Sequence, residues 1–106
     1  MFGRQVTLKL KPNSVTELNR ISADEILPIL RKQKGFRDET TFIAPERSEA
    51  IVNSFWDTKA DAEAYGHTAY AEVLKTLSNV IDGTPTVKNF EFASSTFQQA
   101  ASSKLV

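Results

Sequence analysis

Four stretches of the chain alternate apolar and polar residues, which predicts strands with an apolar face. In the first, over residues 5–11, Val6, Leu8 and Leu10 alternate with polar side chains. Residues 50–56 carry apolar side chains at both parities, so we expect this strand to be buried on both faces for much of its length. The other two stretches cover residues 36–44 and 86–93.

Between the first two strands, apolar residues recur at helical spacing. Ser14 and Glu17 have the spacing of a capping box, which predicts the start of this helix. Pro28 lies inside the pattern and removes one backbone donor, so we expect a kink or break over residues 24–27. Gly35 suits the reversal that follows the helix.

A second helical pattern follows the third strand. Asp57 or Thr58 is the predicted cap, and one continuous apolar arc predicts a helix to about Val80. On such a helix Tyr65 and Tyr70 lie roughly 140° apart, so we expect them to lean to opposite sides of the arc.

The element order is strand, helix, strand, strand, helix, strand, which predicts an α+β fold of the ferredoxin-like β-α-β-β-α-β type. Right-handed crossovers place both helices on one face of a four-stranded antiparallel sheet. The other face then carries apolar side chains from residues 50–56 and from the strand with Phe36 and Phe42. Because such a patch favours burial, we expect the chain to form a homodimer through it.

The length of 106 residues is that of one domain, so we expect a single domain over residues 1–106 with its core over residues 5–93. The segment 94–106 is mostly small and polar. It either frames an interface or is disordered.

Charge and residue types exclude several classes of function. Thirteen basic residues balance thirteen acidic ones, so the electrostatic signature of a nucleic-acid-binding protein is missing. The chain has no cysteine and a single histidine, His67, and we therefore expect no metal site. No apolar run has the roughly 18–20 residues that span a bilayer, and no signal peptide is recognised. We expect a cytoplasmic protein without a membrane partner.

Three local segments resemble one protein family. They are Lys34-Gly35-Phe36, Ser54-Phe55-Trp56 and the nine residues 57–65 (DTKADAEAY). Together they resemble the antibiotic-biosynthesis-monooxygenase (ABM) group of the dimeric α+β barrel superfamily, over roughly residues 5–93. The resemblance implies two four-stranded sheets packed face to face into a barrel, with a pocket in each subunit between its sheet and its helices.

The resemblance also implies an activity. One branch of the group oxidises polycyclic phenols to quinones with neither metal nor flavin, so we expect a monooxygenase that needs no cofactor and acts on an aromatic or polyketide-like small molecule. The alternative is a homodimer on the same scaffold that binds a small ligand, or is structural, without catalysis. A haem-degrading branch carries an Asn on strand one, a Trp in helix two and a later His. Here strand one offers Gln5 and Thr7, Tyr65 stands in place of the Trp and His67 comes too early, which argues against haem degradation.

The polar and aromatic residues suited to such chemistry divide into two groups. We expect His67, as a group that titrates near neutral pH, and Tyr65 to be catalytic. Ligand-pocket residues are then expected among Asn53, Trp56, Tyr70 and Arg37. Each has an alternative: a surface position for His67, core packing for the aromatic residues, and a bridge between strands or subunits for Asn53.

Overall fold

The computed structural model describes residues 1–44, 46 and 48–93, and it has a four-stranded antiparallel sheet. Its strands are β1 (Phe2–Lys9), β2 (Phe36–Ala44), β3 (Glu49–Trp56) and β4 (Thr86–Glu91), in the spatial order β2-β3-β1-β4. This order and the helices between the strands confirm the predicted ferredoxin-like α+β fold. The predicted tail, residues 94–106, lies outside the described residues.

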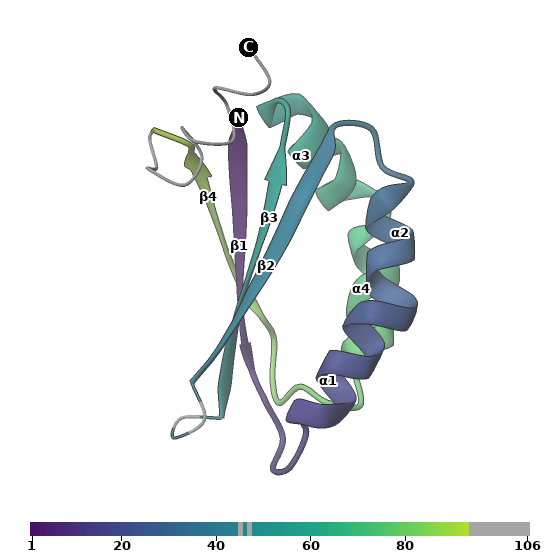
Figure 1. Ribbon diagram of the computed structural model, residues 1–106, viewed down its shortest axis with the longest axis vertical. Coiled ribbons are helices and arrows are strands. Elements are labelled where there is room, and N and C mark those ends of the chain that lie inside the picture. Colours follow the sequence, from purple (N-terminus) through teal and green to yellow (C-terminus); the bar gives the residue numbers. More distant parts are fainter. Residues whose placement is uncertain (45, 47, 94–106) are drawn as a thin grey trace.

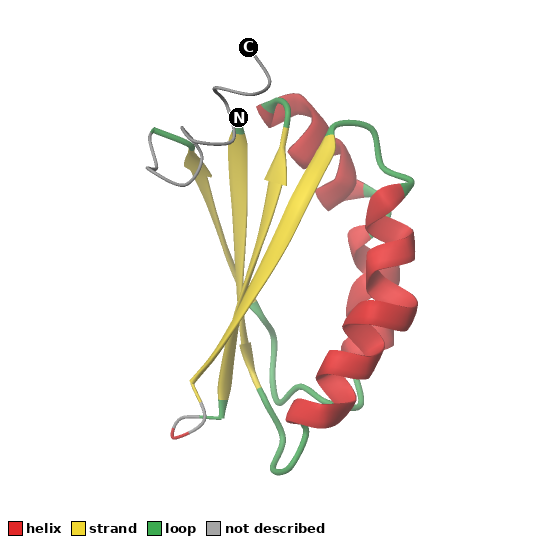
Figure 2. Cartoon of the chain, viewed as in Figure 1, coloured by secondary structure: helices red, strands yellow, loops and turns green. Residues whose placement is uncertain are grey.

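The helices form one layer on a single face of the sheet, as Figures 1 and 2 show. The first crossover contains α1 (Val15–Ile21), a π-helical segment η1 (Ser22–Ile26) and α2 (Leu27–Arg31). The second contains α3 (Lys59–His67) and α4 (Tyr70–Leu77). No helix among the described residues is long and apolar enough to cross a membrane.

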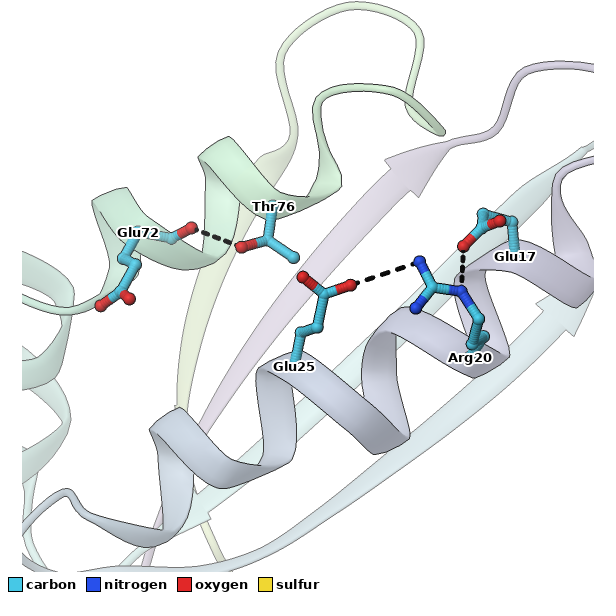
Figure 3. Close-up of polar contacts among 5 residues, drawn as sticks. All are labelled: Glu17, Arg20, Glu25, Glu72 and Thr76. Atoms are coloured by element: carbon cyan, nitrogen blue, oxygen red, sulfur yellow. Dashed lines mark hydrogen bonds and ion pairs between the residues drawn. The ribbon is translucent and has the colours of Figure 1, made fainter.

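The expected irregularity before Pro28 is the π-helical segment. Pro28 lies in the first turn of α2, where its missing N–H is tolerated. A π-helix brings residues five apart onto one side, and Arg20 accordingly contacts both Glu17 and Glu25 (Figure 3). The Arg20–Glu25 contact, at 3.3 Å, therefore bridges α1 and η1 on the solvent side.

The helix starts differ from one another. At Ser14 the predicted capping box is wrong: no side chain caps α1, the Ser14 hydroxyl donates to the carbonyl of Pro12, and Glu17 pairs with Arg20 instead. At α3 the expectation is confirmed, because the Thr58 hydroxyl accepts a hydrogen bond from the backbone N–H of Asp61 at 3.1 Å.

The hydrophobic core lies between the sheet and the helices. On β1 the even-numbered residues face this core, and the register places Trp56, Ser54, Val52 and Ala50 of β3 beside them. Trp56 is fully buried and its ring lies edge-on to that of Phe36. The core is built from these buried hydrophobic residues: Phe2, Val6, Leu8, Leu10, Leu18, Ile21, Ile26, Leu30, Ala50, Trp56, Ala62, Tyr65, Val73, Leu77 and Val80.

On the other face of the sheet, apolar side chains are exposed. Phe42 is 62% exposed and Phe90 is 51% exposed. The strand register places Ile51 and Phe55 on the same face. Phe36 was expected to share a face with Phe42, but an irregularity between Phe36 and Asp38 shifts the alternation and turns Phe36 towards the helices.

Candidate active site

A row of four polar residues crosses the helix-facing side of the sheet: Glu39, Ser54, Arg4 and Asn89. Ser54 of β3 is paired with Glu39 of β2 on one side and with Arg4 of β1 on the other. Neighbouring strands lie about 4.8 Å apart, so the backbones of Glu39 and Arg4 are about 10 Å apart. The rows on either side are mainly apolar, with Trp56 in one and Val52 in the other. A polar row inside an otherwise apolar interface marks this place as the candidate site.

Arg4 is the most unusual member of the row. Its residue surface is only 6% exposed, and its Nη1 has no hydrogen-bond partner among the described residues. The Cζ atom lies 4.1 Å from the ring centroid of Tyr70 and 5.5 Å from that of Tyr65. Aromatic faces attract a cation, but they do not satisfy an N–H donor as an anion would. The site thus contains a buried guanidinium whose Nη1 lacks a hydrogen-bond partner among the described residues.

The two tyrosines meet because the second helix is broken. The sequence predicts one continuous helix here, and that prediction is wrong: α3 ends at His67 and α4 begins at Tyr70. Thr68 departs from helical geometry, with φ −126° and ψ −91°, and its hydroxyl donates to the carbonyl of Ala64. As a result the rings of Tyr65 and Tyr70 approach to 5.9 Å instead of leaning apart.

Trp56 fixes the position of Tyr65. The two rings stack with their centroids 5.0 Å apart, and the Trp56 Nε1–H donates to the hydroxyl of Ser54 at 2.9 Å. The Ser54 hydroxyl in turn lies 3.4 Å from the carbonyl oxygen of Arg4, to which it donates. Aromatic packing and buried hydrogen bonds therefore hold Tyr65, Ser54 and Arg4 in one arrangement.

A small cavity lies against this arrangement. Its volume is about 30 Å³, which suits a water molecule and is too small for an aromatic ring system. Glu39 and Ser54 of the row line it among many apolar side chains, and Arg4 lies behind Tyr65 and Tyr70 without lining it. Its lining is Val6, Leu8, Leu18, Ser22, Ile26, Leu30, Glu39, Val52, Ser54, Tyr65, Tyr70, Val73 and Leu77.

Burial changes the acidity of three groups at the site. It raises the pKa of Glu39 to about 7, with a smaller contribution from the nearby Asp38 carboxylate. Burial also raises the pKa of Tyr65 far above its ordinary value, although the Arg4 charge acts in the opposite direction. The pKa of Tyr70 is raised for the same reason and is also opposed by Arg4. At neutral pH both tyrosines are therefore hydrogen-bond donors, and Glu39 is the group that changes charge.

The structure brings together three of the six predicted site residues. Tyr65, Tyr70 and Trp56 lie together, as described above. Asn53 is on the opposite face of the sheet, where its Oδ1 accepts a hydrogen bond from Gln5 at 3.1 Å. His67 is exposed at the end of α3, and Arg37 is exposed and paired with Asp57.

Arg4 and Glu39 were missed by the sequence analysis. The signal for Arg4 was its place in strand alternation: it lies two residues before Val6 and so shares the apolar face. For Glu39 no comparable signal exists, because the irregularity after Phe36 decides which face it occupies.

Comparison with solved structures finds close matches in fold. A monooxygenase from the gene ActVA-Orf6 of Streptomyces coelicolor, in complex with nanaomycin D, matches with a TM-score of 0.75 and 17% identity, over 89% of this chain and 88% of that one. A Bordetella bronchiseptica protein described as a candidate antibiotic biosynthesis monooxygenase matches with a TM-score of 0.74 and 11% identity, over 88% and 97% of the two chains.

A mutant of MhuD with two manganese protoporphyrin IX molecules per active site also matches, with a TM-score of 0.72 and 12% identity, over 90% and 97% of the two chains. The site described here does not suit such a group. The chain's single histidine, His67, is exposed and does not line the cavity. Tyr65 is a poor substitute ligand, because burial disfavours its phenolate form.

No protein-family model matches the sequence, and no curated protein matches it. The structural neighbours nevertheless include several antibiotic-biosynthesis-monooxygenase proteins, each covering about nine-tenths of the chain. The chain thus has the ferredoxin-like α+β fold of the antibiotic-biosynthesis monooxygenases.

Proposed function

We propose that the protein is a monooxygenase that needs no cofactor and oxidises an aromatic small molecule at the helix-facing side of its sheet. The observation that carries this proposal is Arg4, whose buried guanidinium has an unpaired Nη1 and lies 4.1 Å from the ring of Tyr70, a residue that lines the cavity. A buried charge without a counter-ion is costly, and an anionic ligand supplies the missing partner. A phenol that binds as its phenolate fits this requirement.

Arg4, Tyr65 and Tyr70 have distinct parts in this proposal. The Arg4 guanidinium binds the phenolate oxygen and stabilises the charge that develops there. Tyr65 and Tyr70 stay protonated at neutral pH, so their hydroxyls donate hydrogen bonds, and their rings pack against the aromatic substrate. The surrounding apolar residues exclude water from the reacting anion.

The substrate itself supplies the electrons in this reaction. A phenol with a hydrogen para to its hydroxyl reacts as its anion with O₂. One oxygen atom forms a new bond to the para carbon and becomes the second quinone oxygen, and the other leaves as water. The phenol loses the hydroxyl proton and the para hydrogen, and O₂ is reduced by four electrons in total. The overall change is one phenol and one O₂ to one quinone and one water.

Substrate binding requires the cavity to enlarge. At about 30 Å³ the cavity is far smaller than an aromatic ligand, and the helices of the first crossover close it on one side. Ser22 and Ile26, which belong to η1, form part of that wall. Single π-helical turns inside α-helices are rare and frequently lie at functional sites, so we place the movement that admits substrate there.

A second copy of the chain is the proposed partner for the open sheet face. Phe42, Ile51, Phe55 and Phe90 lie on that face, and two of them are more than half exposed. Asn53 lies among them and hydrogen-bonds to Gln5, so in a face-to-face dimer it lies between the sheets and not in the helix-side cavity. If Asn53 binds a ligand, we propose that it does so between the two sheets of the dimer, whereas Tyr65 acts on the helix-facing side.

A non-catalytic role on the same scaffold is the second candidate. The small volume of the cavity favours it, because a filled core needs no substrate. In that case the chain is structural, or Arg4 binds an anionic ligand that is released unchanged.

Oxygen consumption separates the two candidates. With 1-naphthol, a phenol with a free para position, we expect the purified protein to consume one O₂ for each 1,4-naphthoquinone formed, and to do so after treatment with a metal chelator. Binding of 1-naphthol without oxygen consumption would support the non-catalytic role. The variant Arg4→Met should lose the activity, and Arg31→Met, which changes an exposed arginine, should keep it.

A further inference from the structure

We propose that Glu39 is the catalytic base, which accepts the hydroxyl proton of the substrate while Arg4 holds the resulting anion. This inference deepens the proposed function and rests on it. It assigns different roles to the two charged members of the polar row, a base on β2 and an anion-binding group on β1.

The geometry that supports this assignment is the shared row. Glu39 lines the same cavity as Ser54, Tyr65 and Tyr70. On the neighbouring strand Glu39 is paired with Ser54, and Ser54 is paired with Arg4 on the strand after that. Glu39 and Arg4 form no ion pair with each other or with another described side chain. A half-buried carboxylate and a buried guanidinium that leave each other unpaired can both be paired through a ligand placed between them.

Tyr65 lies near both charged groups. The Arg4 Cζ atom is 5.5 Å from its ring centroid, and Glu39 lines the same cavity as Tyr65. Burial is the main cause of the raised pKa of Tyr65, while Arg4 lowers this pKa and Glu39 adds to it. A substrate hydroxyl placed beside Tyr65 is therefore close to both groups. Its O–H bond breaks as a new O–H bond forms on the Glu39 carboxylate, and the oxygen retains the electron pair beside Arg4.

The acidity of Glu39 suits a base at neutral pH. Its pKa is raised to about 7, first by burial and then by Asp38 on the same strand. The titratable groups from other elements that line the same cavity are Tyr65 of α3 and Tyr70 of α4, and the first crossover contributes only the neutral Ser22, Ile26, Leu18 and Leu30. A general base works best when its pKa lies near the working pH, because it is then largely ionised and still basic enough to take the proton.

The number of protons released on binding tests this assignment without oxygen. At about pH 8, Glu39 is mostly ionised and free 1-naphthol is neutral, since phenols titrate near pH 10. Under anaerobic conditions the wild-type protein should bind 1-naphthol as the naphtholate, seen by its absorbance, and release almost no proton, because Glu39 retains it. In Glu39→Gln the same naphtholate should be accompanied by about one proton released to the solvent, or the naphtholate band should be lost.

His67→Ala is the matched control, because His67 is the other predicted base. It should behave as the wild type does. If the wild type released about one proton per naphtholate, or if His67→Ala rather than Glu39→Gln changed the release, the assignment of Glu39 would be overturned. If Glu39 retained the proton but the protein consumed no oxygen, only the proposed oxygenase activity would be overturned. Failure to bind 1-naphthol at all would overturn both.

Discussion

At the scale of single residues, the site depends on two ionisable side chains that burial affects in opposite ways. Arg4 is a buried cation, and an aromatic face lies beside it while its Nη1 lacks a hydrogen-bond partner among the described residues. Glu39 responds by holding its proton more tightly, with a pKa raised to about 7. The same enclosed surroundings thus give one fixed charge and one that changes with pH.

The raised pKa of Glu39 makes the stability of the fold depend on pH. Because the folded state binds this proton more tightly than the unfolded state, the stabilisation is fully present below the ordinary pKa of 4.5 and is lost as the pH rises towards about 7. We expect a loss of up to about 3 kcal/mol in the free energy of unfolding across this interval. Urea unfolding at several pH values measures it.

Two variants show whether Glu39 is the source of that pH dependence. Glu39→Gln should flatten the dependence between about pH 4.5 and 7. Glu63→Gln, which alters a surface pair with Lys59, should leave it in place. An unchanged slope in Glu39→Gln would show that other groups cause the loss.

At the scale of elements, the interruption between α3 and α4 creates the aromatic wall of the site. Tyr65 lies in α3 and Tyr70 begins α4, and the two rings meet only because the helix is broken at residues 68–69. The π-helical segment η1 forms the facing wall of the same cavity. Both irregularities thus border the candidate site.

The cap of α3 supports this wall, and its removal has a predictable effect. Thr58→Ala removes the hydroxyl that accepts from the Asp61 N–H, so we expect it to destabilise the protein by about 1 kcal/mol in urea unfolding. Thr76→Ala is the control. Its hydroxyl donates only to the Glu72 carbonyl within α4, as Figure 3 shows, so the change should be close to neutral. Equal losses in both variants would contradict the capping role.

Much of the element order was predictable from sequence, because strand alternation and helical spacing are local patterns. The four strands appear where they were expected, with ends that differ by a few residues. The irregularity after Phe36 and the break at Thr68 were not predicted, since both depend on packing against other elements. These two features place Glu39 and the tyrosines, which explains why the fold was predictable and half of the site was not.

At the scale of the whole molecule, the sheet separates two environments. Its helix-facing side contains the polar row and the cavity, and its open side presents exposed phenylalanines. A helix layer protects the first side, and the proposed second copy protects the other.

Substituting the open face tests the proposed dimer. Phe42→Glu and Phe90→Glu place charges among apolar side chains, so we expect a dimer in the wild type and a monomer in the double variant, measured by light scattering. Val15→Glu, which alters an exposed residue of α1 away from the sheet, should remain dimeric. A monomeric wild type would contradict the proposed pairing.

The central claim is that buried Arg4 binds the anionic group of a ligand on the helix-facing side. Its most direct test is the affinity for 1-naphthol of the wild type, Arg4→Met and Arg31→Met, with unfolding in urea as a check of the fold. We expect Arg4→Met to fold at least as stably, because it removes a buried charge with an unsatisfied donor. It should bind about 10–100-fold more weakly, as expected for the loss of a hydrogen bond to a charged group, and Arg31→Met should bind normally. Equal affinity in a folded Arg4→Met would contradict the claim.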